Sequence, residues 1–349
     1  MKTVLLLCCI LLVGCVHVEE QSNRVIIEQF PIEEEIILDS CEVEPVLFFL
    51  GDMLINNDML ITMDLKNDVF FQYFKLPNLS YLGSSTLKGS GPDDEIMILP
   101  NLQTVTDSTW TFRTLSHQKI VYYDLIENRL QLLEAMKVPN EYSMVMNSFL
   151  LKDIILGYDL LGENDKEYIA CDLKSGEVED FGEDFPKVSF SVKTKTPNML
   201  YSKIMSAKND CSSFAALYDK FPLLRIYDKE GSVLSEVEFR NNQRNPLCYA
   251  TDYSSNKDYL NTTINYMKIK TTDRYIYGLY SGKTHLELST SSTDMSDYCS
   301  EVHVWDWSGN PIKRFVLDKP VGCFAVSPDD SFMIFYSYNR DNMLYKLSM

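Results

Sequence analysis

Short apolar runs alternate with short polar turns over most of the chain. The runs are rich in Val, Ile, Phe and Tyr, and they end at Asn, Asp, Gly or Ser. Helical periodicity is almost absent, and residues 129–136 are the one stretch where we expect a helical turn or two. Many short strands joined by tight turns are typical of an all-β protein.

One unit of this pattern recurs. A strand ends in Asp, a polar turn with Gly or Asn follows, and a second strand begins; clear copies are Val121–Asp124, Ile169–Asp172, Arg225–Asp228 and His303–Asp306. In a hairpin the Asp side chain accepts hydrogen bonds from turn amides, and Gly or Asn supplies positive φ. We therefore expect these four aspartates to be structural, at matching outer positions, and not a ring of metal ligands.

The spacing of the copies indicates the architecture. The aspartates lie roughly 50 residues apart, and the last, longer step contains the polar insertion 285–297; repeats of this length with four strands each are propeller blades. Weaker copies at Phe70–Tyr73 and Met343–Leu347 bring the number of blades to six. The sequence thus predicts a six-bladed β-propeller over residues 25–349, and a two-sheet sandwich is the alternative.

The two ends of the predicted ring are expected to meet. The last unit, Cys323–Met349, has room for only three strands. An incomplete blade would expose a strand edge, which proteins avoid. We expect a strand from the N-terminal side, Val25–Phe30 or Glu35–Leu38, to supply the fourth and to close the ring.

The first twenty residues indicate where the protein is sent. Lys2 precedes an unbroken apolar run, Val4–Val13, which is too short to span a bilayer, and Gly14-Cys15 follows. Residues 12–15 resemble the lipobox of bacterial lipoproteins, so we expect a signal peptide over 1–14, a lipidated Cys15 and a tether over 15–24. An ordinary signal peptide cleaved elsewhere is the alternative. An Asp directly after the lipidated cysteine would favour retention in the inner membrane. Because Val16 occupies this position, we expect the outer membrane, and surface exposure is left open.

Composition narrows the partners. Loss of residues 1–14 leaves 335 residues, and loss of Lys2 changes the formal net charge from −18 to −19. Such acidity repels nucleic acid, which we exclude as a partner. Six cysteines remain besides Cys15, and none forms a Cys-x-x-Cys pair, so no zinc site is expected. Cys171 and Cys323 lie in apolar runs and are expected to be buried.

The sequence contains no recognisable arrangement of catalytic residues. His117, His285 and His303 form no metal-binding spacing, and no nucleophile elbow or phosphate loop is present. We expect His303 to be structural and the other two histidines to be solvated, and we assign no catalytic residue, metal or cofactor. A propeller binds ligands where the loops converge at the mouth of its channel. Four residues could line that mouth: Trp110, Arg113, Tyr253 and Arg274. For Trp110, packing in the core is an equally good explanation.

Three segments suggest a family. Lys88–Glu95 resembles the Gly-x-Gly-Pro-x-Glu turn of TolB-like six-bladed propeller lipoproteins of Bacteroidetes, with one additional Asp; Asp273–Gly282 and Val302–Pro311 resemble later blades of that group. The resemblance implies the propeller fold and an address in the bacterial cell envelope. It implies no reaction.

These observations favour a lipid-anchored envelope protein that binds or scaffolds. Its partners would be the membrane, through Cys15, and a protein, peptide or glycan held at one face of the ring. The alternative is a metal-dependent propeller hydrolase or lyase that acts on a small ester or saccharide.

Overall fold

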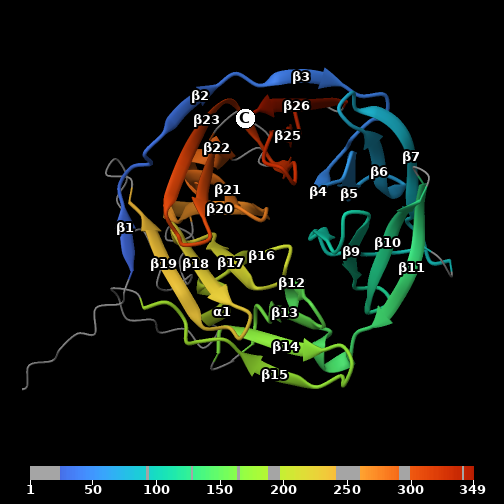
Figure 1. Cartoon of the computed structure of the whole chain (residues 1–349), viewed down its shortest axis with the longest axis horizontal. Helices are drawn as coiled ribbons and strands as arrows, with labels where there is room; N and C mark the ends of the chain where they lie inside the picture. Colours follow the sequence, from blue (N-terminus) through green and yellow to red (C-terminus); the bar gives the residue numbers. More distant parts are fainter. Residues whose placement is uncertain are drawn as a thin grey trace, which may run out of the picture.

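Six sheets, each built mainly of antiparallel strands, stand around a central axis (Figure 1). The computed structural model describes residues 24–91, 94–126, 129–162, 166–187, 197–240, 260–290, 299–339 and 342–349. Each sheet is one blade of the ring, and its strands follow one another from the channel outward. The predicted six-bladed β-propeller is confirmed.

The first three blades follow one another along the chain. Blade 1 contains β4 (Leu50–Asn56), β5 (Met59–Asp64), β6 (Val69–Lys75) and β7 (Ser80–Leu87). Blade 2 contains β8 (Gln103–Thr104), β9 (Thr109–Thr114), β10 (Lys119–Ile126) and β11 (Arg129–Lys137). Blade 3 contains β12 (Met146–Leu151), β13 (Ile154–Tyr158), β14 (Tyr168–Asp172) and β15 (Val178–Phe181).

The other three blades each take a strand from the N-terminal segment. Blade 4 contains β16 (Lys203–Ala207), β17 (Ser213–Tyr218), β18 (Leu223–Asp228), β19 (Val233–Phe239) and β1 (Val25–Ile27). Blade 5 contains β20 (Thr263–Thr271), β21 (Tyr275–Thr284), β22 (Cys299–Asp306), β23 (Pro311–Val321) and β2 (Glu33–Ile36). Blade 6 contains β24 (Cys323–Val326), β25 (Phe332–Tyr336), β26 (Met343–Ser348) and β3 (Asp39–Glu42).

The ring closes as expected, but through a different strand. The closing strand is β3, which pairs antiparallel with β26; the expected segments 25–30 and 35–38 were the wrong choice. They form most of β1 and β2, which instead lie parallel to β19 and β23 as fifth, outermost strands. Figure 1 shows the three strands following the outside of the ring.

Helical structure is sparse, and none lies where it was expected. Residues 129–137 form β11, which pairs with β10 along its whole length, so strand pairing overrides the helical propensity of its Leu, Glu and Ala residues. The helices of the described residues include η1 (Asn140–Tyr142), α1 (Pro197–Leu200) and α3 (His285–Thr290), the last inside the predicted insertion, and residues 260–261 are also helical. Within the described part of the chain, no helix has the length and apolar character needed to cross a bilayer.

The core is divided among the contacts between neighbouring blades. One buried apolar cluster lies at each of the six blade junctions. Strand alternation explains this arrangement, because successive side chains point to opposite faces of a blade. In β17, Phe214, Ala216 and Tyr218 face blade 3, while Ala215 and Leu217 face blade 5.

Candidate functional site

One mouth of the central channel is hollow. A cavity of about 430 Å³ lies at the C-terminal ends of the innermost strands β4, β20 and β24 and at the turns that follow them. Five of the six blades contribute lining residues. The polar side chains among them are Asn56, Asn57, Thr104, Asp107, Asn209, Lys270, Thr271, Thr272, Ser327 and Asp329, and the apolar ones include Leu54, Ile55, Val326 and Phe332.

Lysines from blade 5 cross the channel beneath this cavity. The Lys270 ammonium lies 2.7 Å from Oδ1 of Asp52 in β4, and the Lys268 ammonium donates to the Gly51 carbonyl at 2.5 Å. The other carboxylate oxygen of Asp52 accepts the Leu102 amide at 2.7 Å, just before β8. Side chains thus connect blades 5, 1 and 2 across the axis, and the ion pair has little exposure to solvent, with side chains 12% and 4% exposed.

The rim of the mouth offers hydrogen-bonding groups with few free charges. Asp330 is neutralised by Arg274 at 2.8 Å and accepts the Tyr277 hydroxyl at 2.8 Å. Asp329 bonds the Ser331 hydroxyl and amide, and these contacts lower the pKa of the Asp329 carboxyl. Asn56 is buried and donates to two carbonyls of the β8–β9 turn, while its Oδ1 accepts no hydrogen bond from any described residue.

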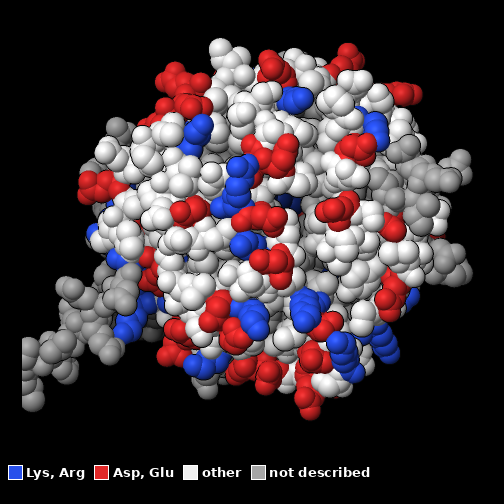
Figure 2. Space-filling view, in the orientation of Figure 1, with Lys and Arg blue, Asp and Glu red and all other residues white. Residues whose placement is uncertain are grey.

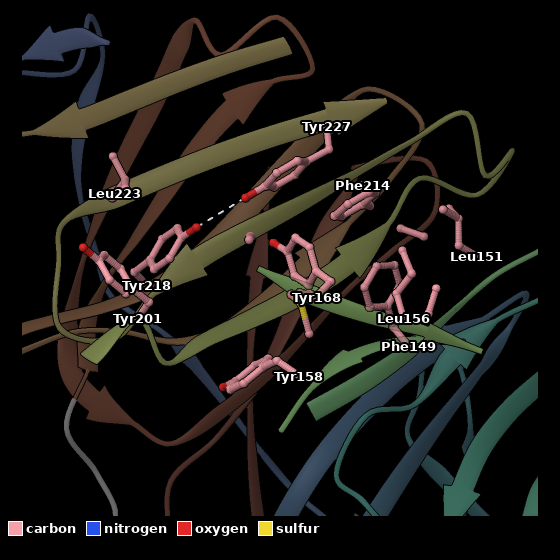
Figure 3. Close-up of a cluster of buried hydrophobic side chains, with 14 of the residues drawn as sticks. Phe149, Leu151, Leu156, Tyr158, Tyr168, Tyr201, Phe214, Tyr218, Leu223 and Tyr227 are labelled. Carbon is pink, nitrogen blue, oxygen red and sulfur yellow. Dashed lines mark hydrogen bonds between the residues drawn. The ribbon is translucent and has the colours of Figure 1, made fainter. Parts of the chain in front are cut away.

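A second polar cluster is buried between blades 3 and 4. Both Glu167 and Lys203 have fully buried side chains, 3.1 Å apart. Glu167 also bonds Arg225 at 3.0 Å and the hydroxyls of Tyr218 and Tyr227. Figure 3 shows Tyr218 and Tyr227 pointing toward each other within the apolar cluster of this junction, with their hydroxyls 3.3 Å apart. Since these side chains are buried and satisfy one another, we interpret the cluster as structural.

This buried cluster continues to the start of the N-terminal segment. Arg225 pairs with Glu236 at 2.5 Å, and the other oxygen of Glu236 pairs with Arg24 at 2.5 Å. Arg24 also reaches Glu238 at 3.1 Å and the Lys187 carbonyl at 2.7 Å. Charges therefore alternate from the core of blade 4 to the residue that precedes β1, which joins that residue to the ring.

Comparison with known proteins agrees with this geometry. The family model described as "TolB-like 6-blade propeller-like" matches residues 49–329, from the start of blade 1 into blade 6. The chain belongs to this family. The resemblance stated from Lys88–Glu95, Asp273–Gly282 and Val302–Pro311 is confirmed. No curated protein matches the sequence.

Solved structures share the fold at low sequence identity. A member of the DUF4221 family from Bacteroides vulgatus superimposes with a TM-score of 0.62 at 11% identity, over 92% of this chain and 97% of that one. A candidate exported protein from Bacteroides fragilis gives 0.58 at 10% identity, over 93% and 100%. At such identities the similarity concerns the propeller fold alone.

Of the four residues suggested for the channel mouth, the three that the structure describes lie in different parts of it. Arg274 does lie beside the cavity, since it donates to the Asp329 carbonyl at 2.7 Å. Trp110 is fully buried between blades 1 and 2, and Arg113 is buried and donates to the Tyr142 and Val145 carbonyls, so both are core residues. Tyr253 lies outside the described residues.

The turn aspartates behave as expected in three blades. The side chains of Asp172, Asp228 and Asp306 each accept hydrogen bonds from two amides of the turn that follows, at 2.7–3.0 Å. Asp124 instead lies within β10, two residues before the strand ends, where it pairs with Gln131, so the expected end of the strand at Asp124 was wrong. Lys88–Gly91, expected to form a turn between blades, does connect β7 toward β8.

The histidines and cysteines form no reactive group among the described residues. His303 is fully buried and bonds Tyr266 and Glu301, as a structural histidine does. His117 is exposed, as expected, and pairs with Glu95 at 3.0 Å, whereas His285 is half-buried. Cys171 and Cys323 are fully buried, as predicted. No set of three or more His, Cys, Asp or Glu side chains placed to hold a metal occurs in the described ranges.

Sequence reasoning missed most of the cavity. Its polar residues lie at the ends of innermost strands and in the turns after them, for example Asn57, Asn209 and Thr272. The available signal was the Asn or Asp-rich turn between the first and second strand of each blade. The repeated aspartate turns from which the fold was predicted lie between third and fourth strands, on the outside of the ring.

Proposed function

We propose that this propeller is a lipid-anchored binding protein of the bacterial envelope that holds a polar segment of a peptide or glycan in its channel mouth. The observation that carries the proposal is the cavity of about 430 Å³, in which five blades converge. Ligand sites commonly occupy a few hundred Å³ and use a small number of placed polar groups. Amide and hydroxyl side chains predominate here, and the Lys270–Asp52 pair lies at the base.

The chemistry of the lining favours a ligand recognised by hydrogen bonds. Asn56 offers a buried acceptor, Thr104 and Thr272 offer hydroxyls, and Phe332 offers an apolar surface. Lys270, which lines the cavity, is already paired with Asp52, which reduces the attraction of an anionic ligand. Envelope peptides and glycans supply uncharged donors and acceptors in this size range.

The location is supported by the N-terminal pattern. The run Val4–Val13 followed by Gly14-Cys15 is what lipoprotein processing requires, and a diacylglyceryl group together with an N-acyl chain on Cys15 would give stable anchoring. These residues lie outside those the structure describes. The candidate exported protein among the structural relatives is consistent with an envelope location.

Binding at the channel mouth can be tested by placing a large side chain in the cavity. Asn209 lines the cavity and is exposed, so Asn209→Trp places a large ring there without disturbing a strand. We expect isothermal titration calorimetry against a panel of neutral oligosaccharides and short peptides to identify a saturable ligand. The tryptophan should weaken its binding by about tenfold or more, the equivalent of one good contact.

The matched control lies on the outer side of the same blade. Lys229 is 65% exposed in the β18–β19 turn, and Lys229→Trp should leave binding unchanged. Binding that is insensitive to Asn209→Trp, or absent across the whole panel, would contradict the proposal.

A further inference from the structure

Four outer strands share one irregularity. In β7, β11, β19 and β23 the pairing with the preceding strand shifts by one residue, near the start of β7, β19 and β23 and in the middle of β11. The residue left without a partner is a large aliphatic one each time: Leu82, Leu133, Leu234 and Ile312. A bulge of this kind bends a strand and increases its twist. These blades therefore repeat a bulge followed by regularly paired residues on the outside of the ring.

The N-terminal segment pairs with the residues that follow the bulge in two blades. β1 pairs in parallel with Val237–Phe239, and β2 pairs in parallel with Arg314–Leu317, in both cases shortly after the bulge. Opposite charges accompany each pairing: Arg24 contacts Glu236 and Glu238, and Glu33 contacts Arg314 at 3.1 Å. The outer edge after a bulge is thus a place where this fold accepts an extended chain.

The equivalent edge of blade 2 is open. After Leu133 come Glu134, Ala135, Met136 and Lys137, all but Met136 exposed. Among the described residues, no strand or bridge pairs with the outer edge of β11. Blade 1 differs, because Lys88 at the end of β7 already forms a parallel bridge with Glu95. β11 is nine residues long, and a long exposed edge is a template for strand addition.

A groove lined by apolar residues together with Ser85, Thr86, Glu95 and Lys119 lies beside this edge. A cavity of about 370 Å³ separates the outer parts of blades 1 and 2, and Tyr123, Leu130, Leu132 and Ala135 line it from blade 2. Leu132 and Leu133 are 59% and 51% exposed. An added strand would direct every second side chain into this groove, because strand side chains alternate in direction.

We propose that the outer edge of β11 binds an extended segment of a partner protein as an added parallel strand. The partner has apolar side chains at alternate positions for the groove, a basic residue beside Glu134 and an acidic residue beside Lys137. The direction follows from β1 and β2, which both run parallel to their host strands. Main-chain hydrogen bonds supply the affinity in this mode, and the groove supplies the selectivity.

The probe for this edge is a synthetic peptide. It has eight residues, blocked ends, valine at alternate positions, lysine near the N-terminus and glutamate near the C-terminus. Added to the full-length protein in detergent, it should slow amide hydrogen exchange in residues 134–137. A peptide with lysine and glutamate exchanged should bind about threefold more weakly or worse, because both cross-strand charge pairs become repulsive. A peptide N-methylated at alternate amides should not bind.

A pair of exposed leucines provides matched variants. Leu132→Lys should weaken peptide binding by about tenfold, the loss expected when an apolar contact of this size is removed. Leu234→Lys changes a leucine of nearly equal exposure, 58%, in blade 4, where β1 already covers the edge, and should have no effect. Protection at β19 in place of β11, tighter binding of the charge-exchanged peptide, or self-association through β11 that blocks the peptide would overturn the proposal. These readouts do not involve the channel mouth.

Discussion

Glu167 and Lys203 pair at a depth where an ion pair is costly to bury. Burial acts to raise the pKa of Glu167, but Lys203, Arg225 and two tyrosine hydroxyls lower it overall. Burial lowers the pKa of Lys203 despite its partner. The ammonium lies 4.8 Å from the ring centres of both Tyr158 and Tyr168, so aromatic faces supply part of the attraction that water would give.

Replacing Glu167 alone should lower the free energy of unfolding more than replacing both Glu167 and Lys203. Glu167→Gln leaves the Lys203 ammonium buried among aromatic rings without an anion, and we expect a loss of about 3–5 kcal/mol in the free energy of unfolding. Adding Lys203→Met removes the stranded charge and should recover part of that loss. Urea denaturation of the two single variants and the double variant measures this coupling, and additive losses would argue against a coupled pair.

Glu301 gives the molecule a sensitivity to acid. Burial acts to raise the pKa of Glu301, but hydrogen bonds from His303 and Arg314 hold it at about 2, below the ordinary 4.5. Its side chain is only 16% exposed. Burial lowers the pKa of His303, which stacks on Tyr280 with ring centres 4.5 Å apart, so the neutral imidazole is favoured.

Both groups should make folding less favourable in acid. A carboxyl with a depressed pKa stabilises the fold fully above its unfolded pKa of 4.5, and that contribution is lost as pH falls toward 2; a histidine with a lowered pKa destabilises the fold once pH falls below 6.5. The Glu301 shift corresponds to about 3 kcal/mol. In Glu301→Gln, the decline of stability between pH 4.5 and 2 should be shallower than in the wild type. An unchanged decline in thermal unfolding scans would contradict this assignment.

At the scale of elements, β3 holds the two ends of the ring together. It pairs with β26 from Asp39 to Glu42, and its Cys41 packs against the cluster between blades 6 and 1. Without this strand, blade 6 would have three strands and an open outer edge. The closure joins residues some 300 positions apart in the sequence, so it forms only when the ring is complete.

Proline in β3 should open the ring. In Ser40→Pro/Cys41→Pro, whichever amide faces β26 is lost, and we expect a loss of about 3 kcal/mol or more, visible as a lower thermal midpoint and faster proteolysis. Ile37→Pro is the control, since Ile37 is 84% exposed and lies between β2 and β3. Equal midpoints for the two variants would show that β3 does not close the ring.

The sequence was most informative where the signal was local. Turns with Asp172, Asp228 and Asp306 are defined by a few adjacent residues, and they revealed the repeat and hence the fold. Strand partners were less predictable, because the choice of β3 over the segments before it depends on contacts with β26 at the other end of the chain. The mouth could not be predicted in detail, since its residues come together only when five blades are placed around one axis.

At the scale of the whole molecule, charge is distributed and not concentrated. On the face shown in Figure 2, lysine and arginine side chains lie among aspartates and glutamates. Acidic side chains gather at the upper left, where Figure 1 places β2 and where Glu33, Glu34 and Glu35 are exposed. On this face basic side chains are therefore interspersed with acidic ones, a distribution that favours solubility.

The anchor can be tested on the whole protein. Cys15→Ser removes the thiol that lipidation requires, so the variant should leave the detergent phase of a Triton X-114 partition and move to the aqueous phase. A Cys211→Ser variant is the matched control, because Cys211 is a half-buried free thiol on the propeller. A Cys15→Ser protein that partitions like the wild type would contradict the lipoprotein assignment.

The attachment of Arg24 determines how the ring carries a mechanical load. A pull on the chain before Arg24 acts first on its contacts with Glu236 and Glu238 and then on β1, which lies parallel to β19. Tension along a pair of parallel strands loads their hydrogen bonds together, in shear, and does not open them one at a time. Under the proposed anchoring at Cys15, tension directed along β1 would therefore be resisted by these bonds together before it reached the closing strand β3.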